Sequence, residues 1–477
     1  MSPADGPATE TGPPRPAGPL RRNRDYLLLW LGAGVSALGD RTAAIAYPLL
    51  MLWDGGSPTD AGFVGFAALL PMLLVQLPAG VLVDRLDRRR TMIVCDVAAL
   101  LALTSVAVAV FSDRLWLVHM MTAAFVGGTA SIFYRLSERA AVRNVVHPAH
   151  LSAALSGNEA RTRAAGLLGQ PLGSSLYGVA RWSPFVFAVV GHLAALVSLL
   201  FIRRRFQSER GRSPLRLRAE MAEGFRWLLG QRFLRAAIGL VAVTNVLFQA
   251  LSLALVLIVK ENGGSPAAIG VIGLVSGLGG IAGALSGSQF VRRLRPGPVI
   301  ISIFGIWTVL MPMVALAREV YLLAALFAGT SFAGAVLNVL AGVYQVRMTP
   351  DEMQGRVGGV SGLLSSGASS LGSLAGGFAL SSAGSTRTVL GVGALMLATL
   401  VAAALIPAVR DARRVDDPDE HDVPAEKSGE AGEPEKFGEP GDPGEPEKSG
   451  KSGEPTEPGE PGRGTAERAG SSSDSAR

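Results

Sequence analysis

The sequence has few charged residues, one cysteine and five histidines, and each scarcity argues against a class of protein. Charged residues make up 17% of the 477 residues, against about 25% in a typical soluble domain, so a soluble globular fold is not expected. The single Cys95 rules out a disulfide framework and a cysteine-based zinc site, and the scattered histidines form no metal motif. We therefore expect neither a metal nor a cofactor.

The sequence also lacks the short motifs that carry enzyme chemistry or nucleotide hydrolysis. It contains no GxxxxGK[ST] loop, no HExxH and no nucleophile elbow. We therefore expect a protein that is not an enzyme and that ATP does not drive directly. The basic residues punctuate apolar runs instead of clustering on a polar surface, so a nucleic-acid partner is not expected either.

Long apolar runs are what the sequence has in abundance. Each run is about 20 residues or longer, the length that crosses about 30 Å of hydrocarbon as a helix. The twelve runs are 26–53, 61–83, 91–111, 115–135, 152–179, 184–202, 234–259, 267–291, 298–317, 320–346, 357–381 and 388–408. Backbone groups in lipid must be bonded within their own segment, which favours helices. We predict an all-α, polytopic membrane protein with twelve transmembrane helices.

The longest connection, 203–233, divides the runs into two sets of six, 26–202 and 234–409. It contains the amphipathic stretch LRLRAEMAEGFRWLLGQRF, which is expected to lie as a helix on the inner membrane surface. The alternative is a solvated linker with one or two helical turns. We predict two pseudo-symmetric six-helix halves joined by a cytoplasmic linker.

Weak internal similarity supports this duplication. Gly80 and Gly283 each precede the end of a run and a group of arginines, and they lie 203 residues apart. The connections around Pro148 and Pro350 also resemble each other and lie 202 residues apart. Two independent pairs with nearly one offset indicate duplicated halves, a common plan among transporters.

Basic residues predict the orientation of the chain. Of the 35 lysines and arginines before Asp411, 29 fall in the regions on the side of the N-terminus and five on the opposite side. Because basic residues are enriched on the cytoplasmic side, both termini are expected to be cytoplasmic. Arginine greatly outnumbers lysine, which is typical of a GC-rich bacterium, so a bacterial plasma membrane is expected.

The two ends of the chain differ from the apolar body. Residues 1–25 are rich in proline and glycine and are predicted to form a disordered cytoplasmic arm. Residues 410–477 are rich in glycine, proline and glutamate and have almost no apolar residues, so they are expected to form a disordered acidic cytoplasmic tail.

The segment PAGVLVDRLDRRRTM, between the second and third runs, carries the strongest local motif. It resembles the signature loop of the major facilitator superfamily, and Asp87 stands where the general pattern has glycine. The form DRxDRRR is typical of a drug-exporter branch that includes macrolide and siderophore exporters. The matching residues, for which the resemblance implies a cytoplasmic gate, are Gly80, Asp84, Arg85, Arg88 and Arg89. The alternative is that these arginines only anchor the loop on the inner side.

Other segments of residues 20–408 extend the resemblance to this exporter branch. The first run carries the pair Gly39-Asp40, and EGFRWLLGQRFLRA resembles the central loop of the branch. LNVLAGVYQVRMTPDEMQGRVGGV resembles its loop before the eleventh span, with Pro350, Glu352, Gly355 and Arg356 in place. The fifth run resembles a Gly-Pro-rich exporter motif and keeps Gly166, Gly169, Pro171 and Gly173, although Gln170 and Ser174 depart from it. Plain helix packing is the alternative for this motif.

Ionisable residues inside a span are costly and usually functional. Asp40 is the candidate for proton or substrate coupling, with a fixed ion pair as the alternative, and Arg41 would favour an anionic or polar group on the substrate. Asp96 is expected to join the cytoplasmic arginine loop, and His192 to be a packed polar residue. Glu138, Arg139, Glu159, Arg161 and Arg163 are expected to form networks at the inner surface.

Uncharged polar residues in the second half form a separate group. Asn245, Gln249 and Asn338 are candidates to line a substrate cavity. Hydrogen bonds between helices are the alternative role for such side chains.

The resemblance implies a monomeric secondary transporter that exports a small molecule by proton antiport with alternating access. Its partners would be the substrate, protons and the lipid bilayer. An importer of the same fold, or a membrane sensor or scaffold that acts through its tail, remains an alternative. The sequence does not identify the substrate.

Overall fold

The computed structural model describes residues 19–202, 206, 217–410 and 412. They all belong to the first of two contact units, residues 1–417, whereas the second unit, 418–477, lies outside the described residues. Most of the predicted arm 1–25 and nearly all of the predicted tail 410–477 therefore lie outside the described part of the chain.

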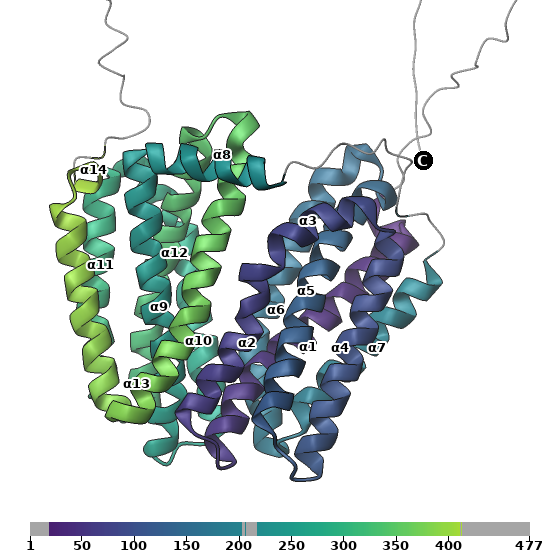
Figure 1. The fold of residues 1–477 in the computed structure, drawn as a ribbon, viewed down its shortest axis with the longest axis horizontal. Helices are drawn as coiled ribbons and strands as arrows, with labels where there is room; N and C mark the ends of the chain where they lie inside the picture. Colours follow the sequence, from purple (N-terminus) through teal and green to yellow (C-terminus); the bar gives the residue numbers. More distant parts are fainter. Residues whose placement is uncertain (1–18, 203–205, 207–216, 411, 413–477) are drawn as a thin grey trace, which may run out of the picture. The chain divides into compact units, whose positions relative to one another are not determined.

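The described residues are helical and contain no strand (Figure 1). The first group of helices consists of η1 (Leu20–Arg22), α1 (Arg24–Trp53), α2 (Pro58–Leu74), α3 (Gln76–Arg85), α4 (Arg88–Phe111), α5 (Leu117–Val145), η2 (Pro148–His150), α6 (Leu151–Val179) and α7 (Ser183–Phe201). The second consists of α8 (Leu217–Gly230), α9 (Arg232–Glu261), α10 (Pro266–Arg293), α11 (Pro296–Val314), α12 (Val320–Met348), η3 (Asp351–Met353), α13 (Gln354–Leu405) and α14 (Pro407–Arg410).

Local sequence signals set several helix ends. Ser57 caps α2, because its hydroxyl accepts from the Asp60 backbone N–H at 3.1 Å while the Asp60 carboxylate accepts from the Ser57 backbone N–H at 2.8 Å. Asp87 caps α4 by accepting from the Arg90 backbone N–H at 2.9 Å. The residue that departs from the general signature loop therefore starts the third apolar helix.

The predicted run 61–83 is broken into α2 and α3, which meet at an angle of 53°. Pro78 has no N–H to donate to the carbonyl of Leu74, four residues earlier, and its ring crowds that carbonyl. Proline is an ordinary cause of so sharp a bend, and the short α3 therefore leaves the direction of α2.

The predicted runs 357–381 and 388–408 form the single long element α13. Gly384 interrupts it with a φ of 78° and a ψ of 173°, so α13 is two helices joined by a sharp turn. A residue with a side chain rarely adopts this backbone conformation, which explains glycine at the turn.

Eight of the described helices are long and apolar enough to cross a membrane, and up to nine crossings result if the bent pair α2 and α3 counts as one. This finding confirms the coarse prediction of an all-helical protein with many apolar spans. The helices α1–α7, here called the N-terminal helices, pack mainly among themselves, as do the C-terminal helices α9–α14.

Glycines bring the two groups of helices together where α13 packs on α2. A Cβ atom on Gly62 would lie 2.9 Å from the Cα atom of Gly377. The Ser373 hydroxyl donates to the Gly62 carbonyl at 3.3 Å, and Phe63 meets Phe378 edge to face at 5.6 Å. The second main contact between the groups joins α10 to α6.

The linker helix α8 lies across the ends of α9 and α13 (Figure 1). Leu228 is buried in a small apolar cluster with Met353 and Val357. The Glu223 carboxylate pairs with Arg356 at 2.8 Å. This helix was expected to lie on the membrane surface, and the structure adds a specific attachment to the C-terminal helices.

Candidate functional site

A cavity with a volume of about 370 Å³ lies between the N-terminal helices and the helices α9 and α13. The ionisable groups that line it come from α1, α4, α5, α6 and α7, whereas the C-terminal side contributes uncharged residues such as Gln249, Ser252 and Ser373. Its volume suits a small organic molecule. The chemistry of this site is therefore concentrated on the N-terminal helices.

Close packing of α1 on α7 creates the centre of the site. A Cβ atom on Gly39 would lie 2.8 Å from the Cα atom of Ala188, and one on Gly191 would lie 2.9 Å from the carbonyl oxygen of Val35. Small residues let two helices in lipid approach this closely. Asp40 and His192 follow these glycines in sequence, so the glycines bring the two side chains within reach.

His192 bridges two carboxylates from different helices. Its Nε2 atom lies 3.0 Å from Asp40 Oδ1 on α1, and its Nδ1 atom lies 2.9 Å from Asp96 Oδ1 on α4. The Asp96 side chain is fully buried and that of Asp40 is 31% exposed. Histidine changes its charge near neutral pH in an unperturbed setting, and both ring nitrogens here face an acceptor. The three groups, here called the His192 triad, can hold and pass a proton beside the cavity.

One expectation from the sequence is wrong at this triad. Asp96 bonds to His192 and lines the cavity instead of joining the arginine loop. Its second carboxylate oxygen, Oδ2, is buried with no hydrogen-bond partner among the described residues. His192 is buried, as expected of a packed polar residue, and it also bonds to carboxylates on two other helices. The sequence did carry a signal for this triad, because Asp40, Asp96 and His192 are three ionisable residues within apolar runs.

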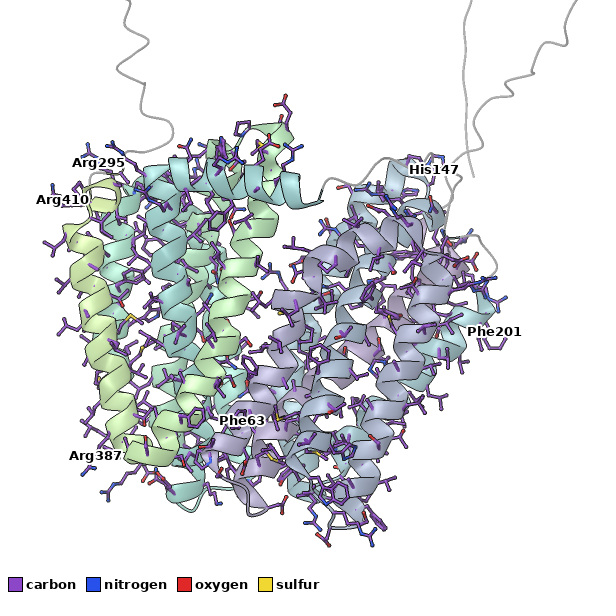
Figure 2. All side chains as sticks on the ribbon, viewed as in Figure 1. Phe63, His147, Phe201, Arg295, Arg387 and Arg410 are labelled. Atoms are coloured by element: carbon purple, nitrogen blue, oxygen red, sulfur yellow. The ribbon has the colours of Figure 1, made fainter. Side chains whose placement is uncertain are left out.

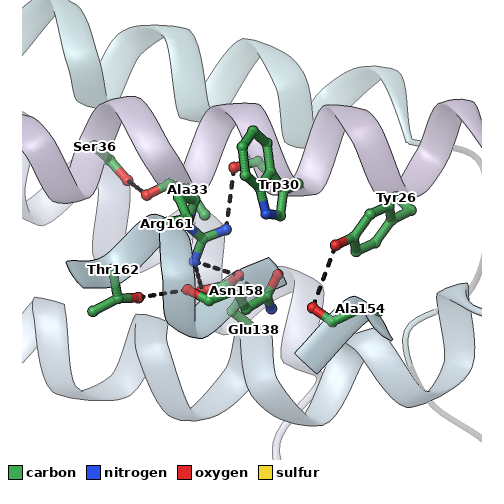
Figure 3. A network of polar contacts seen from close by, with 9 residues as sticks. All are labelled: Tyr26, Trp30, Ala33, Ser36, Glu138, Ala154, Asn158, Arg161 and Thr162. Atoms are coloured by element: carbon green, nitrogen blue, oxygen red, sulfur yellow. Dashed lines mark hydrogen bonds and ion pairs between the residues drawn. The ribbon is translucent and has the colours of Figure 1, made fainter. Parts of the chain in front are cut away.

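A second buried network is centred on Arg161 (Figure 3), and its residues Glu138 and Arg161 also line the cavity. The Arg161 Nη2 atom donates to both Glu138 oxygens, at 2.8 and 3.0 Å, and its Nη1 atom donates to the Trp30 carbonyl at 3.1 Å. Asn158 also donates to Glu138, at 3.2 Å. The network ties α5, α6 and α1 together, and Gly34 leaves room for the Arg161 side chain. Glu159 and Arg163, which were also expected in such networks, form an exposed ion pair at 2.8 Å.

The glycines of the predicted exporter motif in α6 face α1. A Cβ atom on Gly169 would lie 2.2 Å from Arg41 Cβ, and one on Gly173 would lie 2.7 Å from the carbonyl oxygen of Thr42. At Gly166, no other helix that the structure describes lies within 4 Å of the position of a Cβ atom. Pro171 lies on another face of α6, where its Cα atom is 3.1 Å from the position of a Cβ on Gly270 of α10. The motif therefore packs α6 against both groups of helices.

The residues of the predicted gate motif separate into two kinds. Asp84 and Arg85 are exposed at the end of α3. Arg88 is buried and donates to the carbonyls of Ala140 and Phe206, at 3.2 and 3.0 Å. Arg89 donates at 2.9 and 3.1 Å to the carbonyls of Leu199 and Leu200 in the last turn of α7. Here Arg88 and Arg89 tie α4 to neighbouring N-terminal segments.

Gly80, the first residue of the same motif, has no other helix of the described part of the chain within 4 Å of the position of a Cβ. In the second loop motif, Pro350, Glu352 and Gly355 are exposed, whereas Arg356 pairs with Glu223 of α8.

The three uncharged cavity candidates have different positions. Gln249 lines the central cavity. Asn245 donates to the Ser365 carbonyl at 3.4 Å, which is the alternative role of a bond between helices. Asn338 lines a second cavity of about 370 Å³ within the C-terminal helices. Sequence reasoning did not single out Arg135, which lines the central cavity with Arg41.

Apolar helices long enough to cross a membrane surround a cavity lined by ionisable groups, which is the architecture of a multi-pass membrane protein. The chain belongs to the transmembrane secretion effector family, whose model matches residues 15–428. The resemblance to the drug-exporter branch is thereby confirmed.

Known relatives include efflux pumps. The chain is 26% identical over 400 residues to the multidrug efflux pump Tap of Mycolicibacterium fortuitum, a match that covers 81% of this chain and 97% of that pump. It is 25% identical over 270 residues to YfiS of Bacillus subtilis, an uncharacterised transporter of the major facilitator type, and this match covers 55% and 63% of the two chains. The protein is thus a multi-pass membrane transporter related to a multidrug efflux pump.

Solved structures share the fold at low sequence identity. A bacterial homologue of the human lysosomal transporter Spinster matches with a TM-score of 0.62 at 12% identity, covering 82% of this chain and 97% of that one. The nucleoside transporter NupG matches with a TM-score of 0.65 at 11% identity, covering 81% and 100%. These likenesses establish the fold alone.

Proposed function

We propose that the protein exports a small molecule in exchange for protons, by alternating access through the central cavity. The observation that carries this proposal is the His192 triad, which places three proton-binding groups beside a cavity of suitable size. The relation to the efflux pump Tap supports outward transport. Asp40 is the group of the triad that substrate and protons reach, since its side chain is the most exposed of the three.

In the proposed transporter, the described helices form twelve membrane crossings. The spans counted by length and composition omit α1 and α6, which carry Asp40 and Arg161, and they treat α13 as one helix despite the turn at Gly384. Adding α1 and α6 to the nine, and counting α13 as two, gives the twelve crossings that the sequence predicts. The two groups of six would be the pseudo-symmetric halves of the transporter.

The distribution of arginines supports cytoplasmic termini. Figure 2 shows Arg295 and Arg410 at one end of the C-terminal helices and Arg387 at the other. The first end also carries α8 and its arginines, so it would face the cytoplasm. With this orientation, the predicted gate motif and the Glu138–Arg161 network lie on the cytoplasmic side.

The contacts between the two groups of helices support a state that is open to the cytoplasm. Gly62 meets Gly377 and the Lys260 ammonium donates to the Leu52 carbonyl, both beyond the cavity on the proposed outer side. Asp84 and Arg85 are exposed on the opposite side. We propose that these two residues contact the C-terminal helices when the cytoplasmic side closes, as the family resemblance implies.

A resistance panel tests the proposed function. An efflux-deficient bacterial host would express the wild type or Asp40→Asn at matched membrane levels, and growth would be scored against structurally different antimicrobials. We expect the wild type to protect against at least one compound and Asp40→Asn to lose that protection. A well-inserted wild type that protects against none of them would contradict export.

Direction is tested separately in inside-out vesicles from the same host. Adding a compound identified by the panel to respiring vesicles should dissipate their pH gradient, because an antiporter carries protons out of the vesicle as the compound enters. An importer coupled to protons would instead need the opposite gradient to fill the vesicles. This outcome would reject the exporter and retain the transporter.

A further inference from the structure

Two arginine side chains line the central cavity without an acidic partner. They are Arg41 on α1 and Arg135 on α5. Neither guanidinium forms a hydrogen bond or an ion pair with any residue that the structure describes. Arg161, which also lines the cavity, differs in this respect because it donates to Glu138 and to a backbone carbonyl.

Every carboxylate that lines the cavity already has a basic partner. Asp40 and Asp96 share His192, and Glu138 accepts both of its bonds to a guanidinium from Arg161. The acidic groups of the site therefore already have partners, and among the described residues that line the cavity Arg41 and Arg135 are the guanidinium groups with no carboxylate bonded to them.

Both arginines lie well inside their helices. By the rise of 1.5 Å per residue, Arg41 lies about 25 Å from the start of α1 and about 18 Å from its end. Arg135 lies about 27 Å from the start of α5 and about 15 Å from its end. Charged side chains at such depth are expensive, and they usually line a pathway for a solute or bind a counter-ion. An arginine that only marked the inner side would sit at a helix end.

Close packing of α6 against α1 leaves space for the Arg41 side chain. The absence of a side chain on Gly169 leaves the space that the Cβ and Cγ atoms of Arg41 occupy, since a Cβ on this glycine would lie 2.2 and 3.2 Å from them. Arg41 and Arg135 line the same cavity, so an anion that enters it meets both guanidinium groups.

We propose that Arg41 and Arg135 bind an anionic group of the substrate: a carboxylate, sulfonate or phosphate. The guanidinium fork matches the geometry of these groups through paired hydrogen bonds. Apolar residues such as Val64, Leu69 and Met72 form another part of the wall, so the substrate is an amphiphilic organic anion. This assignment rests on the proposed transport through the cavity and specifies its substrate class.

The sign of the charge agrees with export. The interior of a bacterial cell is electrically negative, so the membrane potential favours an anion that leaves as well as a proton that enters. Both movements of an antiporter with an anionic substrate are therefore driven in the same sense.

Equilibrium binding to the purified full-length protein in detergent tests the assignment without requiring transport. The probes are carboxyfluorescein, which is anionic, and rhodamine 123, which has the same xanthene core and is cationic, followed by fluorescence anisotropy. We expect carboxyfluorescein to bind at least tenfold more tightly than rhodamine 123. Equal binding, tighter rhodamine binding or no saturable carboxyfluorescein binding would overturn the proposal.

Variants then locate the site. Arg41→Gln and Arg135→Gln should each weaken carboxyfluorescein binding at least tenfold, whereas Arg143→Gln, an exposed position in the last turn of α5, should stay within twofold. Arg41→Lys and Arg135→Lys serve where a glutamine variant does not fold, and each should weaken binding less than glutamine would. Wild-type binding in the glutamine or lysine variants would refute the assignment. Anion binding without proton-driven export would instead refute the proposed function and leave the substrate class standing.

Discussion

The ion pair between Glu138 and Arg161 gives a sharp test of how charges are held inside this protein. The two side chains are 7% and 8% exposed, and two hydrogen bonds of 2.8 and 3.0 Å join them. In Glu138→Gln the side chain keeps its shape and one acceptor, but Arg161 keeps its charge without a counter-charge. The exposed pair Glu159 and Arg163, four residues apart on α6, offers a matched control.

The expected losses of stability differ clearly between Glu138→Gln and Glu159→Gln. Removing one partner of a buried pair typically costs 3–5 kcal/mol, because the remaining charge is buried and uncompensated. Since glutamine retains one acceptor for Arg161, we expect about 3 kcal/mol for Glu138→Gln. An exposed pair of the i,i+4 kind contributes about 0.3–0.5 kcal/mol, so Glu159→Gln should change stability by about a tenth as much.

The assay is thermal unfolding of the purified protein in one detergent, followed by tryptophan fluorescence and by gel filtration. Glu138→Gln should unfold at a clearly lower temperature than the wild type, and Glu159→Gln close to the wild type. The double variant Glu138→Gln, Arg161→Gln should lose less than the sum of its single variants, because it leaves no unpaired charge. Equal losses for Glu138→Gln and Glu159→Gln would refute the reasoning.

Two further predictions concern the motifs. Gly173→Ala should destabilise the protein by about 1–3 kcal/mol, because its Cβ would meet the Thr42 backbone at 2.7 and 2.8 Å. Gly166→Ala serves as the control and should be neutral or stabilising, because no other described helix lies near its Cβ. Both are measured by thermal unfolding, and similar losses would contradict the packing account. Asp84→Asn should insert normally and lose export in the resistance panel, and undiminished export by a well-expressed variant would reject its gating role.

The positions of the helices followed closely from the sequence. The run 184–202 corresponds to α7 (Ser183–Phe201), because an uninterrupted apolar stretch has few ways to satisfy its backbone in lipid. The bend between α2 and α3 was missed, although Pro78 carried the signal.

The partners of the buried charges did not follow in the same way. Asp40 and His192 are 152 residues apart, and their contact depends on how α1 and α7 are rotated about their axes. Hydropathy does not encode that rotation, since a helix in lipid is apolar on most sides. Asp96 was assigned to the arginine loop for this reason, because it is close to that loop in sequence while its side chain faces α7. The glycines at positions 39 and 191 carried usable information, because they mark the faces on which α1 and α7 touch.

The His192 triad is the proposed site at which protons are coupled to transport. The most direct measurement is the accumulation of a compound from the resistance panel in inside-out vesicles with an imposed acid interior. The wild type and His119→Gln should accumulate the compound when the gradient is present, because His119 bonds to Ser105 at 2.9 Å and is not among the described residues that line the cavity. His192→Gln at equal membrane levels should lose this gradient-driven accumulation. Full gradient-driven accumulation by His192→Gln would contradict the account.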